Sequence, residues 1–207
     1  ANTAYRLIDK ALREFFCGDP RPKHIQVPIA ALQGQAAPHG DFVLGEGGVM
    51  PHPVNVVLTS EKLKAAKKPL LIVGGGARDL AREGGEIAAL MQVTGCASFS
   101  TYAGRGIVPM DHPLHFGPNL GRPDSARVIA EADLVLVIGA QLAEVDIWRE
   151  SLGHTAQMIR VDMSGDQLNT DVGAFFNIRA DAQFFAQALL AELGAHSPAT
   201  DWNAQDI

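Results

Sequence analysis

One run of eleven residues constrains the fold of this chain more than any other feature. Residues 68–78, KPLLIVGGGAR, join a continuously apolar segment to three consecutive glycines. The apolar part, residues 70–73, predicts a strand of a parallel sheet that is buried on both faces. Glycines after such a strand permit a sharp turn and bring backbone N–H groups close to an anion at a helix start. The run therefore predicts either a nucleotide-phosphate loop or a tight turn that needs small residues for packing alone.

The same run argues against an ordinary NAD-dependent dehydrogenase. The dinucleotide fingerprint G-x-G-x-x-G would require glycine at the position of Asp79. The next predicted strand, residues 96–100, is followed by Thr101, whereas that fold places an acid after its second strand to bind a ribose.

Helix and strand patterns alternate from residue 59 onward. Helices are predicted at 59–67, 79–94, 125–131 and 181–193, and strands at 70–73, 96–100, 134–138, 158–161 and 175–178. Repeated βα units with apolar strands indicate an α/β fold, a Rossmann-like parallel sheet between two helical layers.

The first part of the chain has a different organisation. A helix is predicted at 3–16 and a strand at 24–29, while residues 34–55 have the composition of a linker. Residues 1–33 therefore form a helix-strand appendage, which we interpret as the tail of a domain that lies mostly outside this chain, because one strand cannot bury both faces unaided. We place the main domain at 56–195 and the start of a further linker at 196–207. The unpaired strand edge also predicts homo-oligomers.

Composition narrows the function classes. With 47% hydrophobic residues the chain can form a substantial core, and its net charge of −6 offers little attraction to nucleic acid. Cys17 and Cys96 have no metal-type spacing and suit a reducing compartment, so we expect a cytoplasmic location. No apolar run is long enough to span a membrane, and no signal segment is recognisable.

Ligands of parallel sheets collect at the carboxyl ends of the strands, so the residues after each strand are the candidate site. These residues are Gly74, Gly75, Gly76, Thr101, Tyr102, Gly139, Ala140, Gln141, Asp162 and Met163. They supply backbone N–H groups, hydroxyls and one carboxylate, the groups that a nucleotide requires. Asp162 could equally cap the next helix. The long loop 102–123 is expected to lie over this cleft.

Catalytic and metal-binding groups are harder to find. Asp111, His112 and His115 lack a fourth ligand in register, so we expect no metal site there. The sequence has no G-x-S-x-G motif and no evident acid–base pair of carboxylates, and we therefore predict a binding site without catalytic residues.

Five ordered motifs make the chain resemble a known family. They are KPLLIVGGGAR at 68–78, STYAGRGIVPMDHPLHFG at 100–117, EADLVLVIGAQL at 131–142, MIRVDMS at 158–164 and RADAQ at 179–183. The span from 55 to 193 resembles the central domain of thiamine-diphosphate-dependent enzymes of the acetolactate synthase type. The segment ALREFFCGDPRPKHIQVPIAAL is similar to the end of the pyrimidine-binding domain that precedes it in that family.

The resemblance implies a six-stranded parallel sheet and assigns roles to residues. Central domains of this family bind flavin adenine dinucleotide (FAD) or adenosine diphosphate (ADP), or nothing. By resemblance the three glycines 74–76 meet the diphosphate, Thr101 and Tyr102 line the cofactor, and Asp162 with Met163 reaches the ribose or ribityl side. Asp181 and Ala182 would face the adenine. The sequence departs from the flavin-binding pattern at 141–147, QLAEVDI, which leaves ADP or an empty cleft open.

The resemblance also implies an activity for a longer polypeptide. The full-length enzyme would decarboxylate a 2-oxoacid and transfer the resulting carbanion to an acceptor, with thiamine diphosphate and magnesium bound by flanking domains outside residues 1–207. The piece in hand is then expected to be inactive alone. The alternative is a self-sufficient flavin- or nucleotide-binding module, in which the N-terminal helix and strand would pack into the same core. A sirtuin-like deacetylase would need zinc-binding cysteines that two isolated Cys do not provide.

Overall fold

The computed structural model of the chain describes residues 2–17, 21–40, 48–81, 85–170 and 173–203. Contacts divide the chain into two compact units, residues 1–48 and 49–207, and each is described by itself. The division falls within the segment 34–55 that the sequence analysis treats as a linker.

The second unit is built on a parallel sheet of five strands. Their spatial order is β2 (Ala97–Ser100), β1 (Pro69–Val73), β3 (Leu134–Ile138), β4 (Gln157–Asp162) and β5 (Phe176–Arg179). Every residue of β1, β2 and β3 is buried, as the apolar runs predict for strands covered on both faces. The α/β fold class is confirmed.

The sheet has five strands where the resemblance implies six. Residues 114–117 run beside the free edge of β2, where Ser98 forms a parallel bridge with His115. The Ser98 N–H donates to the Leu114 carbonyl and the Phe116 N–H donates to the Ser98 carbonyl, each at 2.8 Å. This part of the long loop thus occupies the position of a sixth strand without extending into one.

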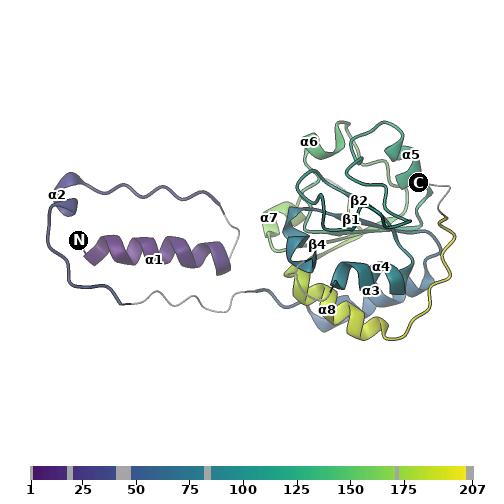
Figure 1. Cartoon of the computed structure of the whole chain (residues 1–207), viewed down its shortest axis with the longest axis horizontal. Helices are drawn as coiled ribbons and strands as arrows, with labels where there is room; N and C mark the ends of the chain where they lie inside the picture. Colours follow the sequence, from purple (N-terminus) through teal and green to yellow (C-terminus); the bar gives the residue numbers. More distant parts are fainter. Residues whose placement is uncertain (1, 18–20, 41–47, 82–84, 171–172, 204–207) are drawn as a thin grey trace. The chain divides into compact units, whose positions relative to one another are not determined.

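Helices cover both faces of the sheet (Figure 1). One face carries α3 (Pro53–Ala65), α4 (Glu86–Thr94) and α8 (Ala182–Leu193), and the other carries α5 (Ser125–Glu131) and α6 (Glu144–Ile147). A buried cluster lies on each side, one centred on Leu71, Val73 and Phe185 and the other on Ile72, Phe99 and Val137. These are the three layers that the alternating pattern predicts.

Local signals explain where helices begin. α3 begins at Pro53, six residues before its predicted start, because a proline suits the first helical position and the His52 side chain accepts from the Val54 N–H. The helix predicted at 79–94 is instead two elements, the 3₁₀ helix η1 (Gly75–Ala81) and α4. Gly85 precedes α4 in the left-handed region, φ 66°, and separates the two; Gly84 lies outside the described residues.

The first unit contains α1 (Asn2–Cys17) and the single turn α2 (Ile29–Leu32). The strand predicted at 24–29 is wrong: residues 24–28 form no strand, because the described part of this unit offers no neighbour for it to pair with. The association that we predicted through its edge therefore loses its basis. Apolar side chains along α1 are exposed, Leu7 at 47% and Ile8 at 42% among them.

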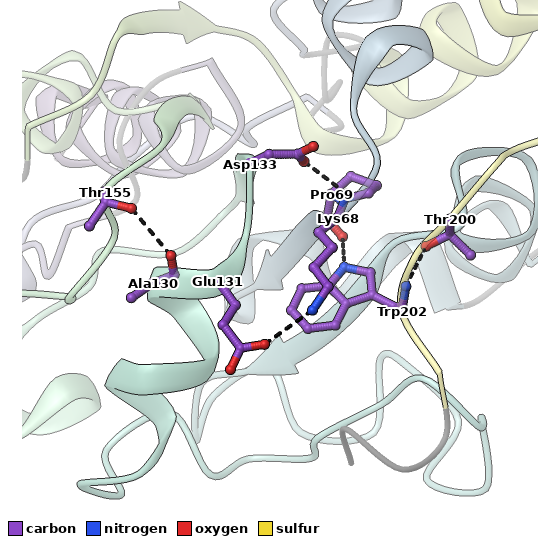
Figure 2. Close-up of polar contacts among 8 residues, drawn as sticks. All are labelled: Lys68, Pro69, Ala130, Glu131, Asp133, Thr155, Thr200 and Trp202. Carbon is purple, nitrogen blue, oxygen red and sulfur yellow. Dashed lines mark hydrogen bonds and ion pairs between the residues drawn. The ribbon is translucent and has the colours of Figure 1, made fainter.

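The segment 198–203 packs against the sheet at the start of β1, although it was expected to begin a linker. The Trp202 side chain is buried, its indole Nε1–H donates to the Pro69 carbonyl at 2.8 Å, and the Lys68 ammonium lies 4.7 Å from its ring centroid (Figure 2). The Lys68 ammonium also pairs with Glu131 at 3.1 Å, and the Thr200 hydroxyl accepts from the Trp202 N–H. This C-terminal segment is thus part of the core.

Candidate functional site

The loops that follow the strands meet at one edge of the sheet. In the observed register Val73 pairs with both Ser100 and Ile138, and Ile138 pairs with Val161. The strands β1 to β4 therefore end at nearly the same level, and the predicted site residues after them come together at the carboxyl edge.

The glycine loop packs tightly against the loop after β3. A Cβ on Gly74 would lie 2.3 Å from the Gly139 carbonyl oxygen, and a Cβ on Gly76 would lie 2.9 Å from the Gly139 Cα. Gly139 itself adopts φ 60°, and a Cβ there would lie 2.5 Å from the Gly76 carbonyl carbon. Side chains are excluded because two backbone segments are in direct contact, so the glycines serve packing.

Two of the three glycine N–H groups in this loop already have backbone partners. The Gly74 N–H donates to the Ile138 carbonyl at 3.0 Å, and the Gly76 N–H donates to the Gly139 carbonyl at 2.9 Å. The Gly74 and Gly76 amides are therefore not free for an anion, as a nucleotide-phosphate loop would require. Of the two alternatives for residues 68–78, a phosphate-binding loop or a tight turn that packs, these hydrogen bonds support the packed turn.

Thr101 and Tyr102 have different environments. The Thr101 side chain is buried, and its hydroxyl oxygen accepts from the Gly104 N–H at 3.2 Å. The Tyr102 side chain is 55% exposed, so of the two it is the one available to contact a ligand.

The acidic residues of the candidate site support local structure. An Asp162 carboxylate oxygen accepts from the Ser164 N–H at 2.8 Å, within the turn that leads into α7 (Gly165–Leu168). An Asp181 oxygen accepts from the Gln183 and Phe184 N–H groups and caps α8. Both carboxylates are half-buried, and the helix after β4 that Asp162 was expected to cap has Ser164 as its N-cap, with the Ser164 hydroxyl accepting from the Gln167 N–H at 3.3 Å.

The remaining predicted residues lie around these loops. The Gln141 side chain is exposed, Met163 is half-buried with its carbonyl accepting from the Arg179 side chain at 3.1 Å, and Ala182 is buried in the first turn of α8. The Ala180 N–H donates to the Asp162 carbonyl, which places the loops after β4 and β5 side by side.

Arg160, which was not predicted from the sequence, is the largest fully buried side chain in the described part of the chain. Its guanidinium donates to the Thr170 hydroxyl at 2.8 Å and to the Ala140 and Gln141 carbonyls at 3.4 and 3.5 Å. Burial lowers the pKa of Arg160 below its ordinary value, and the nearby Asp162 charge raises it. Arg160 thus provides a fixed positive charge beneath the loop after β3. An arginine inside the apolar run MIRV was the signal.

Asp146 was also missed. This residue lies in α6, within the segment that departs from the flavin-binding pattern, and its carboxylate accepts from the Ala143 N–H at 3.3 Å. Burial raises the pKa of the Asp146 carboxyl, while hydrogen bonding by the Ala143 and Tyr102 backbone lowers it. Asp146 therefore supports the start of its own short helix in the loop after β3.

The histidines of the long loop have structural partners. The His115 Nδ1 lies 2.9 Å from the Ser98 hydroxyl, and the His112 Nδ1 accepts from the Leu114 N–H at 3.2 Å. Within the described ranges, no three His, Cys, Asp or Glu side chains are grouped so that they could hold a metal ion. A search of the same residues found no helix that is both long and apolar enough to cross a bilayer.

The arrangement at the carboxyl edge is suited to binding. It combines backbone dipoles, a buried guanidinium, an exposed tyrosine ring and two half-buried carboxylates, which together match the parts of a nucleotide.

Comparison with known proteins identifies similar chains. The family profile described as "Thiamine pyrophosphate enzyme, central domain" matches residues 59–189. The "Probable 2-ketoarginine decarboxylase" of Pseudomonas aeruginosa is 35% identical over 90% of this chain and 33% of its own length. The pyruvate oxidase of Lactiplantibacillus plantarum is 25% identical over 99% of this chain and 34% of its own length.

A solved structure shares the fold. The benzoylformate decarboxylase of Polynucleobacter necessarius superposes with a TM-score of 0.59 at 21% identity, over 79% of this chain and 31% of that one. The chain spans about a third of the length of the curated relatives it matches.

Proposed function

Since the chain belongs to the thiamine pyrophosphate enzymes, as their central domain, we propose that it is the non-catalytic middle of a 2-oxoacid decarboxylase or carboligase. The similarity to the "Probable 2-ketoarginine decarboxylase" over nine-tenths of this chain supports a decarboxylase over other activities. Within the first unit the described residues leave the apolar face of α1 exposed, which supports a unit that is completed by further protein. The reaction belongs to the whole enzyme.

The residues described do not fit thiamine diphosphate and its magnesium ion. A magnesium diphosphate requires oxygen ligands that converge on the metal, and the described residues contain no such cluster. Flanking domains would therefore hold this group, which supplies the electron sink for decarboxylation when bound. The role of this central domain is then to position those flanking domains.

We further propose that the carboxyl edge binds an adenine nucleotide, ADP or FAD. The observation that carries this proposal is the convergence of four strand ends above the buried Arg160 guanidinium. The buried Arg160 guanidinium, which donates to the Ala140 and Gln141 carbonyls, gives the loop after β3 a positive potential that favours a diphosphate, and Tyr102 offers an exposed ring. The internal bonds of Gly74 and Gly76 mean that fewer loop amides are left for the phosphates than in a phosphate-binding loop of free N–H groups.

The test is a thermal-shift titration of this chain with ADP, FAD and NAD. A ligand at a hundred times its dissociation constant stabilises the fold by about 2.7 kcal/mol. The matched variants are Gln141→Glu, which adds a negative charge at the exposed carboxyl edge, and Gln157→Glu, which adds the same charge at the start of β4. Charge repulsion should weaken binding about tenfold, or about 1.4 kcal/mol, in Gln141→Glu alone.

Two outcomes contradict the proposal. No shift with any nucleotide would leave the domain a purely structural role, and an equal loss in both variants would place the nucleotide elsewhere. In the same samples, pyruvate should not be decarboxylated when thiamine diphosphate and magnesium are added. Turnover by this chain alone would refute the assignment as a non-catalytic domain.

A further inference from the structure

A pocket lies on the α5 face of the sheet. This open depression has a volume of about 460 Å³, within the range of about 300–1,000 Å³ that small-molecule sites occupy. Its lining residues come from β2, the long loop and α5, and they include Phe99, Met110, Phe116, Arg122, Asp124 and Arg127. None of them belongs to the candidate site described above.

The loop that forms this pocket is held in place by its own hydrogen bonds. The Asn119 side-chain amide donates to the Phe116 carbonyl at 2.6 Å, and the Ser125 hydroxyl donates to the Asn119 carbonyl at 2.5 Å. The Arg149 guanidinium also donates to the Leu120 carbonyl of this loop at 2.8 Å. The pocket wall is therefore formed before a ligand arrives, which reduces the entropy lost on binding.

The pocket is positively charged within an acidic chain. Its lining includes Arg122 and Arg127 against the single carboxylate of Asp124, whereas the chain as a whole carries −6. In the described part of the chain, neither arginine side chain is in an ion pair, and Asp124 makes no side-chain bond to cap α5. Two guanidinium groups of this kind favour a carboxylate or phosphate.

The other wall of the pocket is aromatic. The rings of Phe99 and Phe116 stack with centroids 4.7 Å apart and planes inclined by 15°, and Phe116 is only half-buried. His115 is buried beside them, with its Nδ1 on the Ser98 hydroxyl and its Nε2 without a partner among the described residues. A buried ring nitrogen of this kind is a ready hydrogen-bond partner.

We propose that this pocket binds an organic anion that carries an aromatic ring. The ring packs against Phe116 and the Met110 side chain, and the anionic group lies between Arg122 and Arg127. The pocket is too small for a folded partner and combines an apolar wall with a charged rim, as sites for amphipathic small molecules do. This site is additional to the proposed nucleotide site and does not depend on it.

The test is isothermal titration calorimetry of the chain with 2-naphthoate, 2-naphthyl phosphate and the neutral 2-naphthylmethanol. We expect the two anions to bind and the alcohol to bind at least about tenfold more weakly, because it lacks the charge-assisted contacts. The carboxylate and phosphate arms distinguish which anionic group the site prefers. Histidine-selective ¹H–¹⁵N spectra should show the His115 resonances moving on binding.

Matched variants localise the binding. Arg122→Gln and Arg127→Gln should each weaken binding of the anions about tenfold, whereas Arg105→Gln, in the same long loop but outside the pocket lining, should leave it unchanged. All three arginines are exposed, so the variants should fold. The proposal is overturned if neither anion binds, if the alcohol binds as well as the anions, or if Arg105→Gln has the same effect as the pocket variants.

Discussion

Replacement of Trp202 by alanine should destabilise the domain strongly, although this residue lies beyond the last strand and helix. The side chain is 5% exposed, meets Phe116 edge-on with centroids 6.2 Å apart, and donates from Nε1 to Pro69. Truncation of a buried tryptophan costs about 3–5 kcal/mol. For a domain of this size the melting temperature should fall by roughly 6–20 °C.

A graded series separates the contributions. Trp202→Phe keeps most of the apolar area and removes the donor to Pro69, which should cost about 1–2 kcal/mol. Lys68→Met removes the cation over the ring, worth about 0.5–1 kcal/mol, and a surface ion pair with Glu131 that contributes little. The double variant Lys68→Met/Trp202→Phe should cost less than the sum of the two, because the cation and the ring interact.

The assay is urea unfolding followed by far-ultraviolet circular dichroism, which does not depend on tryptophan fluorescence. Trp148→Ala is the matched control, because that side chain is 68% exposed and its removal should change the free energy of unfolding by less than about 0.5 kcal/mol. A loss of under about 1 kcal/mol in Trp202→Ala, or an equal loss in both variants, would refute the reasoning.

Three further predictions concern the core and its titration. Gly139→Ala should destabilise by about 2–4 kcal/mol in urea unfolding, because it adds a Cβ at φ 60° against the backbone of the glycine loop, whereas Gly165→Ala, where the Cβ meets no atom within 4 Å, should be nearly neutral. Burial raises the pKa of Cys96 to about 12, so in a Cys17→Ser variant iodoacetamide should label this thiol only on unfolding; rapid labelling of the native fold would contradict this. Burial lowers the pKa of His115, so the unfolded state takes up a proton at a higher pH than the folded state, and the free energy of unfolding should fall as pH drops below the ordinary pKa of 6.5. Urea unfolding at a series of pH values should show a smaller fall in the free energy of unfolding for His115→Gln. The same fall in the variant and the parent chain would rule out His115 as the cause.

The sheet could be predicted from the sequence because its strands carry their signal locally. Residues 70–73 and 134–138 are unbroken apolar runs, and both are fully buried strands in the structure. The sequence HIQVPI at 24–29 has a similar apolar pattern, but the described residues of the first unit include no strand with which it could pair. It therefore does not form a strand. The single turns α6 and α7 are too short for a helical period to appear in the sequence.

The sequence predicted that the candidate residues would converge at one edge of the sheet, but it did not predict the hydrogen bonds that they form there. Strand order brings the residues after β1, β3 and β4 to one edge, as the parallel pattern implies. A glycine in a sequence shows that space is short, but not whether a ligand or another backbone fills it. At Gly74 and Gly76 the neighbour is the chain itself, and only coordinates could show that.

The burial of Trp202 has a practical consequence for expression of the domain. The match to the family profile ends at residue 189, yet the hydrophobic core includes Trp202, which lies beyond that point. A gene fragment cut at the end of the homologous region would code for a protein with a gap beside Phe116 and an unshielded first strand. Cloning boundaries for crystallisation or solution work should therefore extend at least to residue 203.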